Sequence, residues 1–202
     1  MSLITSIADL ETLYGTPSEA SDIKVSDRLT SHYKSLIEAS PFVALATSGP
    51  EGLDCSPRGD PNQVMVVQDN KTLLMPDRHG NNRIDSLRNI VRNGEIALMF
   101  LIPGSNTTLR VNGTAVVSVD PELLNAHTVA EKSPRSMIIV TIREIYFQCA
   151  RAIMRSGLWE PDKFVAKDDL PTTGQIMQEL KESFDGATYD AEWPARAKET
   201  MW

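Results

Sequence analysis

Three arginines in the first half of the chain stand where the backbone favours anion binding. Arg58 lies in the stretch "CSPRGDP", between Pro57 and Gly59, directly after an apolar run. Arg78 follows another apolar run, and Arg83 stands at the predicted start of a helix. Free N–H groups at a helix N-terminus attract anions, and an arginine beside them binds an oxyanion bidentately while staying charged. This pattern predicts a phosphate monoester site built by guanidinium groups from separate segments.

The same stretch contains the tripeptide Arg-Gly-Asp, which can act as an adhesion ligand in extracellular proteins. The N-terminal segment has no basic region followed by an apolar one, so we expect no secretory signal. No apolar run approaches the ~20 residues that a membrane span needs. We therefore expect a cytoplasmic protein, in which the tripeptide arises by chance and Arg58 serves a binding site.

The distribution of charge points to a small anionic ligand. The net charge of −7 argues against nucleic acid as a partner. Residues 55–92 nevertheless hold six basic side chains against four acidic ones, whereas residues 157–202 hold five against ten. The alternative is that Arg78, Arg83 and Arg88 are solvated surface residues that pair with the neighbouring carboxylates of Asp77 and Asp85.

The two cysteines, Cys55 and Cys149, lie far apart and belong to no CxxC pair or His/Cys cluster. We therefore expect neither a metal site nor a redox dithiol. Both stand in apolar, strand-like surroundings, which predicts buried free thiols. No Ser-His-Asp order and no paired carboxylate stands out, so the sequence assigns no catalytic residue.

Periodicity predicts short helices between many strands. A helix is expected over Asp27–Ala39 with Ser26 as its N-cap, a second after Asn81 or Asn82 and ending at Gly94, and a third after Asp120. Within the strand around residues 108–119, Asn112-Gly113 predicts a bulge. Strands are expected at 42–48, 53–57, 64–68, 72–76, 95–103, 108–119 and 137–150.

The strand pattern favours a mainly β fold with peripheral helices. Six or seven antiparallel strands joined by tight turns fit a closed barrel better than a sandwich. Beyond Trp159 the composition turns polar and predicts one or two amphipathic helices. We therefore expect three parts, in chain order an N-terminal helical extension, a barrel, and a C-terminal helical tail that packs on the barrel or on a partner subunit: 1–40, 41–161 and 162–202.

The order of several motifs carries a family resemblance. The segments "SPRGDP", "LLMPDRHGNNRIDSLRNI", "IALMFLIPG", "TLRVNGTA" and "CARAIMRSGLW" follow one another between about Ser40 and Pro161. In this order and spacing the chain resembles the pyridoxamine 5′-phosphate oxidase-like family of FMN-binding split β-barrels. It is most similar to a subgroup of FMN-dependent enzymes without an assigned substrate.

The resemblance implies positions for the cofactor. Ser56 and Arg58 fall where the family places its phosphate-binding residue at the end of the second strand. Met75 and Pro76 fall where backbone runs along the isoalloxazine ring. A basic pair that grips the phosphate in the family corresponds here to Asn82-Arg83, so Arg83 alone keeps a charge.

The resemblance is less complete at other positions. Arg78 compensates for the charge that is missing at Asn82, and His79 could add a hydrogen bond to the phosphate. Thr108 stands in the region of a glutamine that the family places near the pyrimidine edge of the flavin. The C-terminal segment by which oxidase members recognise pyridoxal phosphate has no recognisable counterpart, so that oxidase activity is not expected.

Arg151, Arg155 and Trp159 recur at four-residue spacing and would share one helix face. Such a face could cover the open side of the flavin or bind an anionic substrate, in this subunit or its partner. It could equally form a cation–π patch at an interface.

Three functions remain open from the sequence. The first is a homodimeric FMN-dependent oxidoreductase that exchanges a hydride equivalent with a small substrate, the cofactor supplying the chemistry. The second is a flavin-binding carrier or stress-response protein without turnover. The third is a relative that uses F420 or haem in place of FMN.

Overall fold

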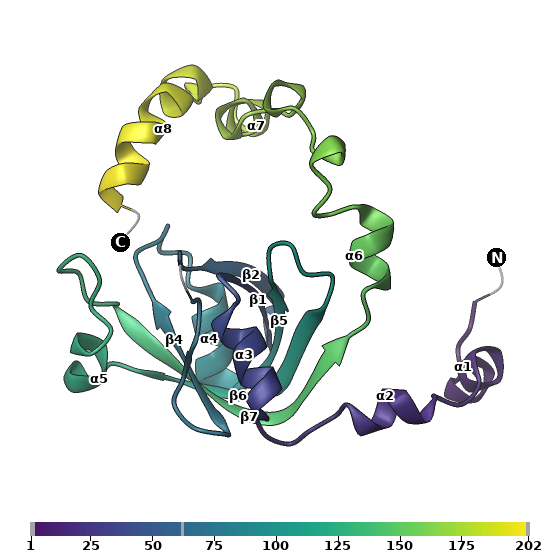
Figure 1. Ribbon diagram of the computed structural model, residues 1–202. Helices are drawn as coiled ribbons and strands as arrows, with labels where there is room; N and C mark the ends of the chain where they lie inside the picture. Colours follow the sequence, from purple (N-terminus) through teal and green to yellow (C-terminus); the bar gives the residue numbers. More distant parts are fainter. Residues whose placement is uncertain (1–2, 62, 201–202) are drawn as a thin grey trace.

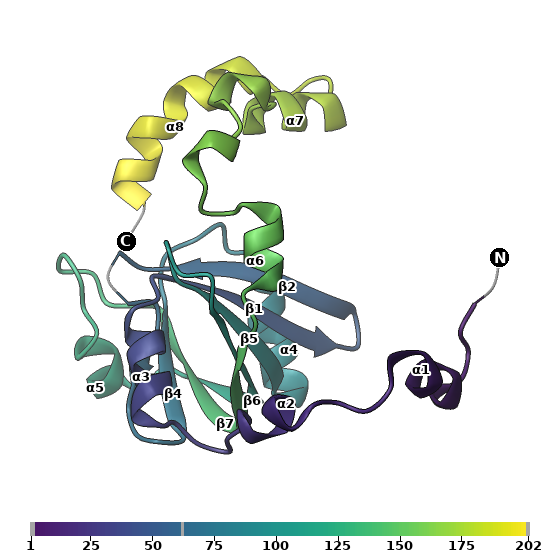
Figure 2. The ribbon, with the colours of Figure 1, turned by 45° about the vertical axis from the view of Figure 1, so that its right-hand side comes forward.

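The computed structural model describes residues 3–61 and 63–200. Its centre is a seven-stranded antiparallel sheet with the strand order β2-β1-β5-β6-β7-β4-β3. The sheet curls around a single core, and helices lie outside it (Figures 1 and 2). The strands are β1 (Phe42–Gly49), β2 (Gly52–Gly59), β3 (Val66–Val67), β4 (Thr72–Asp77), β5 (Glu95–Leu101), β6 (Thr108–Ser118) and β7 (Ser136–Gln148). The expected split-barrel architecture, mainly β with peripheral helices, is confirmed.

The strands form because every second residue is apolar and faces the core. Along β1 the side chains of Val43 and Leu45 are fully buried, while the residues between them are partly exposed. The long pair β6–β7 shifts register between Asn112 and Gly113, which confirms the predicted bulge. A Cβ atom at Gly113 would lie 2.1 Å from the carbonyl oxygen of Thr141, so this close approach requires glycine.

The helix predicted over Asp27–Ala39 is shorter at its start. It is α3 (Ser31–Glu38), and its N-cap is Thr30, whose hydroxyl accepts from the backbone N–H of Tyr33. The prediction of Ser26 as N-cap was wrong, because the backbone of Ser26 exchanges two hydrogen bonds with Ile145 on β7. A bridge to a distant strand thus overrides the local capping preference.

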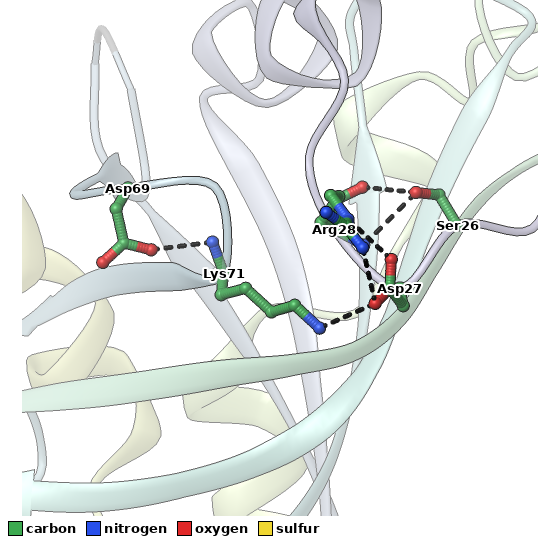
Figure 3. A network of polar contacts seen from close by, with 5 residues as sticks. All are labelled: Ser26, Asp27, Arg28, Asp69 and Lys71. Atoms are coloured by element: carbon green, nitrogen blue, oxygen red, sulfur yellow. Dashed lines mark hydrogen bonds and ion pairs between the residues drawn. The ribbon is translucent and has the colours of Figure 1, made fainter.

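A network of charged side chains fixes the segment just before α3, residues 26–28, to the turn between β3 and β4 (Figure 3). The carboxylate of Asp27 accepts from Arg28 at 2.8 Å and from Lys71 at 2.9 Å. Those two hydrogen bonds lower the pKa of Asp27 to about 2. Asp69 accepts from the backbone N–H of Lys71 and stabilises the turn itself.

Two further helices precede the barrel, α1 (Ile7–Tyr14) and α2 (Glu19–Ile23), and they extend away from it in both views (Figures 1 and 2). Two helices lie between strands: α4 (Asp85–Asn93) connects β4 to β5, and α5 (Pro121–Asn125) lies between β6 and β7. After β7 come α6 (Arg151–Ser156), the 3-10 turns η1 (Pro161–Lys163) and η2 (Lys167–Asp169), α7 (Thr173–Leu180) and α8 (Gly186–Thr200). Among the described residues, no helix is long and apolar enough to cross a membrane.

The segment after β7 arches over one end of the barrel and returns to it at the end of α8 (Figures 1 and 2). There the ammonium group of Lys132 donates to the carbonyl of Glu199 at 3.0 Å. The Nδ1 atom of His79 lies 3.0 Å from the carbonyl oxygen of Thr200. The ammonium group of Lys132 therefore meets the carbonyl end of α8, where the helix dipole favours positive charge, and the ring of His79 contacts the same end.

The prediction of buried thiols was wrong for both cysteines, which are exposed in this chain. Cys55 lies on β2, the strand at one edge of the sheet, where odd-numbered residues face outward. Cys149 follows the last residue of β7. An apolar neighbourhood in sequence does not reveal which face of a strand is covered, and the sheet decided that.

Candidate functional site

A cavity of about 860 Å³ lies where the end of β2 faces the end of β4. These strands stand on opposite sides of the strand order and are not hydrogen-bonded neighbours in the described sheet. β2 turns alternate residues, namely Asp54, Ser56 and Arg58, into the cavity. From the opposite side β4 contributes Met75 through its last residue, Asp77. The site thus occupies the split of the barrel.

Two ion pairs cross this split. Arg58 on β2 pairs with Asp77 on β4, and Asp60 beyond β2 pairs with Arg78 beyond β4 at 3.0 Å. All four side chains are largely buried. Both charged residues of the Arg-Gly-Asp tripeptide are therefore engaged inside the molecule. Of the surface alternative, the exposed pair of Arg83 with Asp85 is found. Asp77 instead pairs with Arg58, and Arg78 pairs with Asp60 and is largely buried.

The amino end of α4 opens into the same cavity. Its N-cap is Ile84, which offers no side-chain acceptor, so the prediction of an asparagine cap was wrong. Asn81 instead accepts from the backbone N–H of Arg83, and Asn82 adopts a positive φ of 61°. The first turn of α4 lines the cavity without a capping side chain, which leaves its N–H groups available to an anion. The carboxyl end of α4 lies where it was predicted, at Gly94, which adopts the left-handed conformation.

Among the cavity residues that the sequence reasoning missed are Asp54, Ser86, Arg135 and Ser136. Arg135 donates to the side-chain oxygen of Asn82, and Ser136 is the first residue of β7. The hydroxyl of Ser136 is buried and has no hydrogen-bond partner among the described residues. Such a group costs free energy unless something pairs with it. A signal was present, because Ser-Pro-Arg occurs twice, at residues 56–58 and 133–135, and both copies flank the cavity.

Charges of opposite sign are balanced around the cavity. The exposed pair Arg83–Asp85, at 2.8 Å, adds to the two pairs that cross the split. Anion binding here would depend on directed N–H and O–H donors rather than on a net positive potential. The charged lining comprises the arginines Arg58, Arg78, Arg83 and Arg135, the aspartates Asp54, Asp60, Asp77 and Asp85, and His79.

A second cavity of about 310 Å³ adjoins the first and shares part of its lining. It lies beside the end of α8, since His79 and Lys132 both line it and both contact that end. Its lining is Arg78, His79, Lys132, Ser133 and Arg135.

Seven of the eight residues predicted to bind a cofactor line the larger cavity, namely Ser56, Arg58, Met75, Pro76, Arg78, Asn82 and Arg83. The eighth, Thr108, does not: it is buried at the start of β6, opposite Gln148 on β7.

The predicted stripe of Arg151, Arg155 and Trp159 does not line the cavity. It is not a single helix face either, because α6 ends at Ser156 and Gly157 is left-handed. The indole N–H of Trp159 instead donates to the carbonyl of Ser105 at 2.7 Å.

Solved structures similar to this chain include HupZ of Group A Streptococcus, with 21% identity, a TM-score of 0.49, and coverage of 60% of this chain and 94% of HupZ. An F420 reductase has 22% identity and a TM-score of 0.42 over 59% of this chain and 98% of its own. An FMN-binding protein from Syntrophomonas wolfei has 14% identity and a TM-score of 0.42 over 56% of this chain and 86% of its own. At these scores the similarity carries no conclusion about activity. No curated protein matches the chain.

The family comparison is stronger, because the family model described as pyridoxamine 5′-phosphate oxidase matches residues 29–149. That range holds the whole seven-stranded sheet, which ends at Gln148, together with α4 and every residue of the larger cavity. The chain therefore belongs to the pyridoxamine 5′-phosphate oxidase family.

Proposed function

We propose that this protein is an FMN-dependent oxidoreductase that binds FMN in the split of the barrel. The observation that carries the proposal is the convergence of seven family-implied residues on one cavity, together with the uncapped amino end of α4. The cavity volume of about 860 Å³ lies within the range of cofactor sites, roughly 300–1,000 Å³.

The residues present fit a phosphate monoester. Arg58 donates through Nε to Ser56 and through Nη1 to Asp77, which leaves Nη2 for an oxyanion. The N–H groups of the first turn of α4 and the unpaired hydroxyl of Ser136 supply neutral donors. Arg83 is mostly exposed and could close over the phosphate from the solvent side.

A second copy of the chain would complete the site. The outward face of β2, β1 and β5 is apolar, whereas an exposed face of an antiparallel sheet is normally polar. On this face Ala44 stands between Pro57 and Met99, and Ala46 stands between Cys55 and Ala97. A homodimer that buries this face would cover Cys55 and place a second subunit beside the split.

When bound, FMN supplies hydride transfer, and the protein supplies position and electrostatics. Arg58, Ser136 and the amino end of α4 would hold the phosphate. The backbone of Met75 and Pro76 would lie along the ring and fix its orientation. The partner subunit would exclude water from the covered side of the ring.

The test is to identify the small molecule that co-purifies with the protein by its mass, and then to mix the protein with NADH and NADPH without oxygen. We expect FMN and bleaching of its absorbance. FMN without bleaching by a broad panel of reductants would favour a carrier, and F420 or haem would replace the cofactor assignment. A protein that neither retains nor rebinds FMN would overturn the proposal.

A further inference from the structure

A chain of four hydrogen-bonded side chains connects β2 to α4 along one wall of the larger cavity. Ser86, in the first turn of α4, donates to the carboxylate of Asp54. The hydroxyls of Ser86 and Ser56 lie 2.8 Å apart. The Nε atom of Arg58 donates to Ser56 at 3.3 Å. We name this chain the Asp54–Ser86–Ser56–Arg58 relay.

The direction of every bond in the relay is determined. An ionised carboxylate only accepts, and a serine hydroxyl has a single hydrogen to donate. Because Ser86 gives its hydrogen to Asp54, Ser56 must be the donor in the bond between the two hydroxyls. The oxygen of Ser56 then turns its lone pairs to Arg58, whose guanidinium can only donate. The relay therefore has one arrangement of hydrogens, and Asp54 sets it.

The relay limits how Arg58 can orient. Ser56 holds Nε and Asp77 holds Nη1, so the guanidinium is fixed at two of its three nitrogens. Ser86 is only 3% exposed, which restricts its own rotamers. Because Ser86 belongs to α4, the same bonds also fix the amino end of that helix relative to β2.

We propose that Asp54 and Ser86 are positioning residues, which align Arg58 and the amino end of α4 on the phosphate of the ligand. This inference rests on the proposed function. It adds that the preference for a phosphorylated over an unphosphorylated flavin depends on two residues that need not touch the phosphate. Preorganised donors bind an anion more tightly than mobile ones, because less orientational freedom is lost.

The test compares dissociation constants for FMN and for riboflavin, which lacks the phosphate, by flavin fluorescence quenching. Ser86→Ala should weaken FMN binding about tenfold, as expected for one lost, well-positioned hydrogen bond. Riboflavin binding should change less than about twofold, since riboflavin gains nothing from Arg58. Asp54→Ala should behave like Ser86→Ala. Asp54→Asn keeps an acceptor oxygen for Ser86 and should therefore lose less FMN affinity than Asp54→Ala.

The matched control is Ser35→Ala, which removes an exposed hydroxyl on α3, away from the cavity. It should leave both constants unchanged. The melting temperature of each ligand-free variant reports folding. Should Ser86→Ala not fold, the graded comparison of Asp54→Asn with Asp54→Ala decides the question.

Equal losses for FMN and riboflavin would mean that the relay supports only the fold, and the inference would be rejected. Unchanged FMN binding in the variants would reject it too, while leaving the proposed function intact. Failure of the wild-type protein to prefer FMN over riboflavin would instead overturn the proposed phosphate site, and the inference with it.

Discussion

Arg58 and Asp77 form an ion pair between β2 and β4, two strands that no backbone hydrogen bond joins in the described sheet. The second pair, Asp60 with Arg78, runs in the opposite sense between the segments that follow these strands. Each side of the split thus supplies one arginine and one aspartate. Both pairs bridge the split, and the same arginines stand in the proposed phosphate site.

Arg58→Ala should weaken FMN binding about tenfold to a hundredfold, because a hydrogen bond to a charged group contributes ~1.5–3 kcal/mol. The loss also leaves Asp77 without its cation beside the phosphate. Arg88→Ala, which removes an exposed arginine of α4 outside the cavity lining, should change the constant less than about twofold. Fluorescence titration measures both. Equal constants for the two variants would mean that the phosphate lies elsewhere.

The pair of Arg58 and Asp77 should contribute to folding stability. A double-mutant cycle with Arg58→Ala and Asp77→Ala should give a coupling energy of about 1–3 kcal/mol, because both side chains are largely buried. The exposed pair Arg83–Asp85 is the control and should couple by less than about 0.5 kcal/mol. Urea unfolding gives these values. A coupling near zero for the first pair would show that the split closes without it.

Acid should weaken the network around Asp27. The pKa of Asp27 is lowered from 3.8 to about 2, so the folded state binds its proton less readily than the unfolded chain does. The stabilisation is therefore present above pH 3.8 and is lost as the pH falls through about 2. The difference in unfolding midpoint between the wild type and Asp27→Asn should vanish over that range.

The same group can be followed directly by NMR titration of its carboxyl carbon. Lys71→Met removes one of the two donors to Asp27 and should move its pKa back toward 3.8. A titration midpoint near 3.8 in the wild type would contradict the network that Figure 3 shows.

Gly113→Ala should destabilise the protein by about 1–3 kcal/mol, the usual cost of overpacking. The added Cβ would meet the backbone of Thr141, which cannot move without opening the bulge between β6 and β7. Gly80→Ala is the matched control, because a Cβ there meets no atom within 4 Å. Thermal unfolding compares the two. A Gly113→Ala protein as stable as the control would show that the strands separate easily at this point.

Much of the fold could be predicted from the sequence because its signals are local. Alternating apolar residues marked the strands, Asp120 and Pro121 marked the start of α5, and Gly94 marked the end of α4. The caps at Ser26 and Asn82 were wrong, because distant partners on β7 and at Arg135 engage those residues. The stripe through Trp159 failed because a left-handed Gly157 ends its helix.

The sequence by itself determined which segments supply arginine at strand ends, and with them the family and most of the candidate site. Only the tertiary structure decided that Arg58 meets Asp77, that Ser136 faces the cavity unpaired, and that Thr108 and Arg151 lie outside it. The physical reason is that residue type and spacing act over a few residues, whereas the pairing across the split depends on how the sheet curls.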